Sequence, residues 1–150
     1  MHNLLKIFWE WFPLSYDEYA EKGIHQSSGE REEYFQYFSQ LLVYAKSIIE
    51  NNKIDEESID DLLTILALDN EMESILELIV EKSSNEQLQR IIYYGIKYPL
   101  YNTRWQLAEI VYKRKPAYCK EYLLALSHDS HHYVRKRARN CLNYMGLKLS

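Results

Sequence analysis

Side chains that can bind metal ions gather near the C-terminal end of the sequence. His128, Asp129, His131 and His132 lie close together there. A zinc site on a helix needs two histidines one turn apart, whereas adjacent residues point about 100° apart. We therefore expect a solvated turn with an aspartate cap, and neither a metal nor any other cofactor.

The two cysteines, Cys119 and Cys141, form no redox or disulfide motif. They lie far apart in the sequence, and neither has a neighbouring base that would activate its thiol. Cys141 falls on the apolar stripe of a predicted helix, which is typical of a small core residue. Because no other catalytic motif stands out, we expect a protein that is not an enzyme.

Carboxylates crowd the middle of the chain. The run 55–61 (DEESIDD) is followed by Asp69, Glu71, Glu73, Glu77 and Glu81. Paired carboxylates can serve as general acid and base, but nothing here indicates a cleft around them. Two interpretations stay open: a solvated helix face, and a docking surface for a cationic protein.

The net charge of −4 hides an asymmetry. Residues 1–100 carry −11, and residues 101–150 carry +7. The basic runs 113–115 (KRK) and 135–139 (RKRAR) lie near Trp105, and such a mixture can bind nucleic acid through phosphate contacts and stacking. The acidic remainder would repel a duplex, so nucleic acid is the weaker alternative.

Composition favours one all-α domain. The chain has 150 residues, 47% of them hydrophobic, with only 4 Gly and 3 Pro for tight turns. No apolar run is long enough for a membrane span, and no targeting segment is visible. With its free cysteines, the protein is expected in the cytoplasm.

Apolar residues at helical spacing, together with end signals, predict helices throughout the chain and no β-strand. Ser15 and Glu18 form a capping box, Asn85 is the expected cap of a later helix, and Gly146 follows the last one. The predicted helices cover residues 3–12, 16–22, 30–51, 56–67, 70–82, 86–97, 103–114, 117–127 and 131–145. Short connections make neighbouring helices antiparallel.

The last helix pairs share a spacing of 31 residues. RWQLAEIV (104–111) aligns with RKRARNCL (135–142), and ESILELIV (73–80) falls at the equivalent earlier position. A repeat of two helices with a period near 30 residues is typical of an α-solenoid.

Residues 128–146 resemble the second half of a HEAT repeat. The matching features are Asp129 in the turn, Val134–Arg135 in the first helical turn, and then Ala138 and Leu142. The resemblance implies a short right-handed stack of about three HEAT-like pairs over 55–146, capped by the helices of 1–52. It also implies that Asp129 caps the helix and that Arg135 reaches Asp129 or the preceding pair.

One predicted helix, 103–114, has two distinct sides. Thr103, Leu107, Ile110 and Val111 form one side, and Trp105, Glu109 and Tyr112 form the other. In the repeat, the second side faces the concave surface, where exposed aromatic residues are typical interface anchors. Alternatively, the N-terminal helices cover these aromatic residues as part of the core.

In its size, acidity and aromatic content the chain resembles the immunity proteins of bacterial toxin systems. This resemblance implies a non-enzymatic bacterial protein that binds and neutralises a cationic, nuclease-type toxin. The expected partner-binding residues are Asp60, Asp61, Glu73, Glu77, Glu81, Trp105, Glu109 and Tyr112. The alternatives are a HEAT-like protein that binds nucleic acid through its basic C-terminal helices, and an adaptor subunit of a larger assembly.

Overall fold

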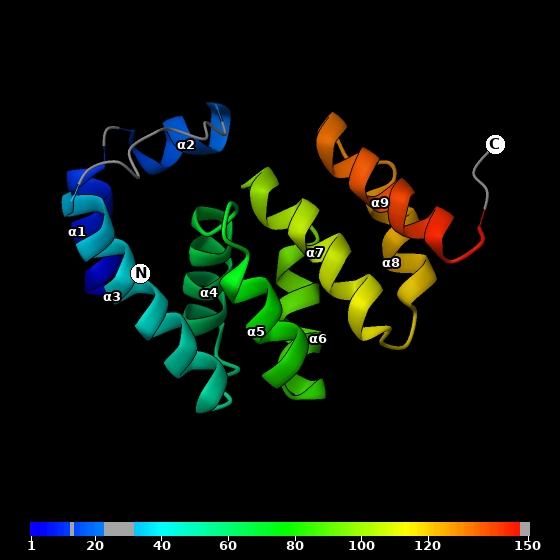
Figure 1. Ribbon diagram of the computed structural model, residues 1–150, viewed down its shortest axis with the longest axis horizontal. Coiled ribbons are helices and arrows are strands. Elements are labelled where there is room, and N and C mark those ends of the chain that lie inside the picture. Colours follow the sequence, from blue (N-terminus) through cyan, green and yellow to red (C-terminus); the bar gives the residue numbers. More distant parts are fainter. Residues whose placement is uncertain (13, 23–31, 148–150) are drawn as a thin grey trace.

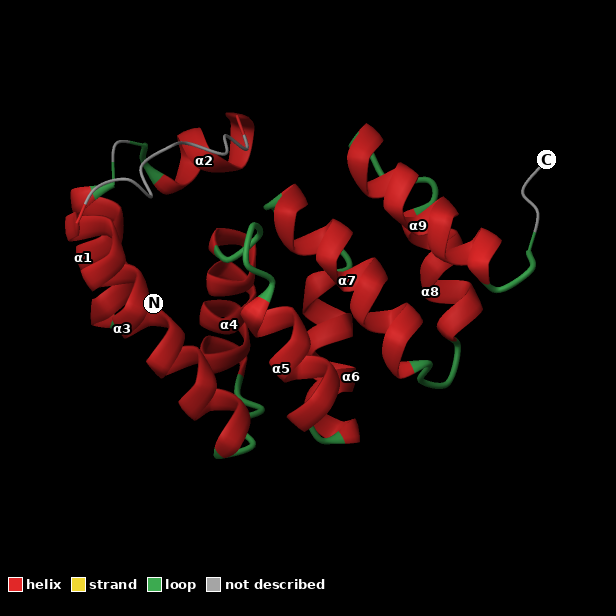
Figure 2. Ribbon diagram, in the orientation of Figure 1, coloured by secondary structure: helices red, strands yellow, loops and turns green. Residues whose placement is uncertain are grey.

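A computed structural model describes residues 1–12, 14–22 and 32–147, and this part of the chain is helical without any strand (Figure 2). The all-α prediction is confirmed. None of the helices in these ranges is long and apolar enough to cross a bilayer. The helices are α1 (Asn3–Trp11), α2 (Tyr16–Lys22), α3 (Glu32–Glu50), α4 (Glu56–Leu68), α5 (Ser74–Lys82), α6 (Asn85–Gly95), α7 (Tyr101–Arg114), α8 (Cys119–Leu126) and α9 (His132–Tyr144).

The helices lie in two layers (Figure 1). Helices α3, α5, α7 and α9 form one row, in which each packs on the next, and α4 and α6 pack together in the layer behind. Helix α1 packs on α3. Helix α7 lies in the middle and contacts α4, α5, α6, α8 and α9, so nearly every side of it is buried.

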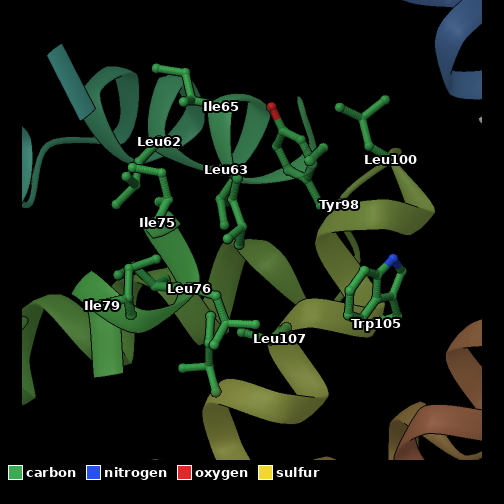
Figure 3. Packing of buried hydrophobic residues seen from close by; sticks show 14 of the residues in the cluster. Leu62, Leu63, Ile65, Ile75, Leu76, Ile79, Tyr98, Leu100, Trp105 and Leu107 are labelled. Carbon is green, nitrogen blue, oxygen red and sulfur yellow. The ribbon is translucent and has the colours of Figure 1, made fainter. Parts of the chain in front are cut away.

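The central core is built where α4, α5 and α7 meet (Figure 3). Leu62 and Leu63 of α4, Ile75 and Leu76 of α5 and Leu107 of α7 are all fully or almost fully buried. Burying a leucine or isoleucine side chain contributes about 1.5–3 kcal/mol, so this junction supplies much of the driving force for packing the two layers together.

Polar side chains of α7 bond to its neighbours inside this packing. Thr103 Oγ1 donates to the Leu63 carbonyl, and Gln106 Nε2 donates to the Leu66 carbonyl, both at 2.7 Å. The last carbonyls of a helix have no partner within it, so Gln106 completes the end of α4. Two polar residues that sequence patterning places near a core are thereby satisfied when buried.

Helix α5 begins four residues later than predicted. Glu73 has a left-handed backbone, with φ of 56°, which interrupts the helix expected from residue 70. Asp69 accepts a hydrogen bond from the Ile75 backbone N–H at 2.8 Å and so fixes the turn before α5. The aspartate competes with the helix for backbone donors, which is a tertiary effect that apolar spacing does not reveal.

Three predicted caps have different outcomes. Ser15 accepts from the Glu18 N–H at 3.2 Å, as predicted. Helix α6 is capped by Ser84 rather than Asn85, since the Ser84 hydroxyl accepts from Gln87 N–H.

At the start of α9, His131 is the cap in place of Asp129. His131 Nδ1 accepts from the Tyr133 N–H at 3.1 Å, while Asp129 accepts from the His131 N–H at 2.8 Å. The prediction that Asp129 itself caps this helix is wrong, because its carboxylate is held one turn earlier.

Two arginines 31 residues apart make the same backbone bond. Arg104 Nη1 donates to the Tyr98 carbonyl at 2.6 Å, and Arg135 Nη1 donates to the Asp129 carbonyl at 2.8 Å. Arg104 also binds the Asp129 carboxylate through Nε and Nη2, at 2.8 and 3.0 Å. Asp129 thus joins α7 to the turn before α9, and both charged side chains are largely buried.

Arg104→Ala is expected to destabilise the fold by about 3–5 kcal/mol, because it leaves the Asp129 carboxylate buried without its cation. Arg135→Ala removes one bond to a carbonyl and is expected to cost only about 1–2 kcal/mol. Urea denaturation of both variants checks the order. Equal losses would contradict the central place given to the Arg104–Asp129 pair.

Asp69 is a buried acid whose proton contributes to stability. Its Oδ1 has no hydrogen-bond partner among the described residues, and burial raises its pKa to about 6 although the Ile75 and Ser74 N–H groups lower it. An aspartate in an unfolded chain has a pKa near 3.9. Between these values the folded state holds a proton that the unfolded state releases, so stability falls as the pH rises.

Asp69→Asn cannot ionise and retains an amide oxygen as acceptor. Between pH ~4.5 and ~7 we expect the wild type to lose roughly 2 kcal/mol relative to this variant. Urea midpoints of both proteins at the two pH values measure the difference, in which all other titrating groups cancel. Parallel midpoints would show that Asp69 is ionised throughout.

Candidate protein-binding surface

Trp105 is an internal residue and not an exposed anchor. Its side chain is 4% exposed, and its indole N–H donates to Asn102 Oδ1 at 2.8 Å. The prediction of an exposed tryptophan is wrong because α9 covers it: the Tyr133 ring meets it edge-on, and the Arg137 guanidinium lies 4.5 Å from its centroid. The alternative that it belongs to the core holds, although α9 rather than the N-terminal helices provides this cover.

Glu109 is committed to the same internal cluster. Its carboxylate accepts from Arg137 Nε at 2.8 Å, and Arg137 Nη1 donates to the Tyr133 hydroxyl at 2.8 Å. Both members of this ion pair are largely buried. A partner that used Glu109 would first have to break this pair.

Tyr112 keeps part of its surface exposed near the end of α7. The Lys115 ammonium lies 4.1 Å from its ring centroid, and the Tyr144 ring packs at 5.9 Å. Of the three residues predicted on this side of α7, Tyr112 is therefore the one still available for contact.

Asp61 is a structural carboxylate. It is 1% exposed and accepts hydrogen bonds from the Tyr44 hydroxyl at 2.7 Å and the His2 N–H at 3.2 Å. Burial raises its pKa, whereas the Tyr44 bond lowers it. Its prediction as a contact residue is wrong, since it points inward to join α1, α3 and α4.

Asp60, its neighbour, points outward into an open cavity of about 580 Å³. Glu56 and Glu57 of α4 share this cavity, and Tyr94 and Lys97 lie on its α6 side. Three carboxylates thus meet at one place, two of which were not predicted as contact residues.

A second cavity, of about 780 Å³, continues along α6. Tyr93, Tyr94 and Tyr122 line it together with Arg90, and Tyr94 and Lys97 belong to both cavities. We call the two together the α6 groove. Tyr93 is 73% exposed.

Sequence reasoning missed this groove. The signal lay in the spacing of Arg90, Tyr93, Tyr94 and Lys97, which repeats at intervals of three and four residues on the side of α6 opposite its buried Leu88.

The other predicted acids lie on α5. Glu77 and Glu81 are exposed and Glu73 is half-buried. In the described ranges none of the three forms an ion pair. These three residues, here called the α5 stripe, belong to the helix row that excludes α4 and α6, so the predicted acids do not converge in one cavity.

The arginines of the C-terminal third are largely used inside the fold. In addition to Arg104, Arg135 and Arg137, Arg114 donates from Nη1 to the Ile79 and Ser83 carbonyls, where it completes the end of α5. The exposed cations in this region are Lys113, Lys115, Lys120, Lys136 and Arg139.

The groups with catalytic or metal-binding chemistry are engaged in packing. His131 caps α9 and stacks on the Tyr101 ring at 3.8 Å, and burial lowers its pKa. Both cysteines are free and buried, and burial raises the pKa of both thiols, for Cys141 to about 12. No cluster able to hold a metal ion occurs in the described part of the chain.

Comparisons of the chain with protein-family models, curated proteins and solved structures found no match. The function therefore has to be argued from the surface itself.

Trp105→Ala is expected to lower the free energy of unfolding by about 3–5 kcal/mol, because it opens a cavity and leaves Asn102 and Arg137 without their aromatic partner. Thermal or urea denaturation measures the loss. An unchanged stability combined with weaker partner binding would restore the role of Trp105 as a surface anchor.

Proposed function

We propose that this protein is a non-enzymatic protein-binding domain whose partner is a cationic protein, as in the immunity proteins that neutralise basic nuclease-type toxins. One contrast carries the proposal: buried arginines are neutralised or hydrogen-bonded inside the fold, while carboxylates of α4 and α5 remain exposed. The surface charge is thus more acidic than the sequence balance suggests. Exposed charge of one sign steers an oppositely charged partner and speeds association.

We propose that the scaffold is a short HEAT-like solenoid of three pairs, α4–α5, α6–α7 and α8–α9, with α1 to α3 at its N-terminal end. The matching bonds of Arg104 and Arg135, 31 residues apart, support this repeat. So does the single row made by α3, α5, α7 and α9 (Figure 1). Such arrays present extended surfaces to other proteins.

Nucleic-acid binding has less support. Phosphate contacts need exposed cations, and four of the arginines in the basic third donate their guanidinium bonds to groups of the chain itself. Five exposed cations remain there, against the carboxylates of the other helices.

The test is binding to the product of the reading frame next to this gene, purified in an inactive form if it is a nuclease. We expect a complex whose association slows at least about tenfold between ~50 and ~500 mM salt. A basic product that does not bind, or binding that salt leaves unchanged, would contradict the proposal.

Reversing exposed carboxylates should weaken the same complex. Glu56→Lys, Glu77→Lys and Glu81→Lys together are expected to slow association by about tenfold or more, with a melting temperature close to that of the wild type. Surface plasmon resonance and a thermal scan give the two readouts. Asp61 is left unchanged because reversing a buried carboxylate would unfold the chain.

A further inference from the structure

We propose that the α6 groove is the seat of the partner and accepts a basic segment of it, while the α5 stripe only steers the encounter. The inference rests on the proposed function and assigns it to one face of the molecule. Two independent properties of the groove carry it: a shape that can enclose a segment, and a charge that differs between its ends.

The α4 end of the groove suits a cationic side chain. Glu56, Glu57 and Asp60 lie around one cavity, and the rings of Tyr94 and Tyr98 form part of its wall. An arginine or lysine that enters meets carboxylates and aromatic faces together, and both attract a cation. Within a concavity these contacts are screened less than on an open surface.

The α8 end of the groove suits aromatic or apolar side chains. Tyr93, Tyr94 and Tyr122 lie along it, and the Tyr93 and Tyr94 rings meet edge-on at 5.0 Å. Tyrosine supplies a large, stiff contact area at little conformational cost and is frequent among the residues that dominate interfaces.

Charge gives the bound segment a direction. Arg90 and Lys97 line the tyrosine end, so positive charge there opposes the three carboxylates at the other end. A segment is favoured when its basic side chain points to α4 and its aromatic or acidic side chains point to α8. Reversing the segment would place like charges together at both ends.

The α5 stripe differs in kind from the groove. Glu77 and Glu81 are exposed, and neither lines the groove. Charges on an open surface mainly change the rate of association, whereas groups that enclose a partner mainly change its rate of dissociation. The two sets of acids should therefore affect binding in different ways.

The probe is a phage-displayed library of random dodecapeptides selected against the full chain. The best enriched peptide is then synthesised with a fluorescent label, and its affinity is measured by fluorescence anisotropy. We expect enrichment of peptides that combine arginine or lysine with an aromatic residue. Four variants are compared, in two matched pairs.

The acid pair is Glu57→Gln/Asp60→Asn in the groove against Glu77→Gln/Glu81→Gln on the stripe, which change the net charge equally. The tyrosine pair is Tyr93→Ala against Tyr144→Ala, since Tyr144 is similarly exposed, at 71%, but lies on α9. We expect each groove variant to weaken binding about tenfold or more and each control variant less than about threefold.

The outcomes separate the two proposals. Enriched peptides without basic residues would contradict a cationic partner, and with it the proposed function. Basic peptides whose affinity falls equally for the groove and stripe variants would leave the proposed function standing and overturn the groove as its seat. Failure to enrich any peptide would also overturn the groove, because a preformed groove should bind an isolated segment.

Discussion

Helix α7 lies between both layers of the molecule, and the polar side chains that it buries must find partners on neighbouring helices. Thr103 and Gln106 donate to carbonyls of α4, and Arg114 donates to carbonyls at the end of α5. Leaving one such group unpaired would cost about 1–3 kcal/mol, which is a large part of the stability of a small domain. These bonds fix the angle and register at which the neighbouring helices pack, because each donor reaches a particular carbonyl.

This demand also determines the character of the surface. Arginines that give the C-terminal third its positive charge are drawn inward, where Asp129 and Glu109 neutralise two of them. The carboxylates of α4 and α5 are not needed for packing and stay in solvent, apart from Asp61 and Asp69. A formal net charge of −4 therefore describes the molecule poorly as a partner would meet it. The exposed carboxylates follow from how the interior is held together.

The sequence predicted the helices well because apolar spacing and end signals act locally. It failed where distant groups compete for the same atoms. Asp69 takes a backbone donor and delays α5, and Asp61 turns inward to meet Tyr44. Trp105 was assigned to the outer side of its helix, and nothing local announced that Arg137 would cover its ring. The acids of the candidate surface could be found from their number, whereas the tyrosines of α6 could not be placed beside them until α4 and α6 were packed together.

The central claim is that binding belongs to exposed carboxylates while the arginine-rich helices serve the fold. Hydrogen–deuterium exchange of the full chain, with and without its basic partner, tests this claim most directly. We predict slower exchange on binding in residues 55–61 and 89–99, with little change in residues 101–114 and 132–144. Protection confined to α7 and α9, around Glu109 and Arg137, would contradict the account.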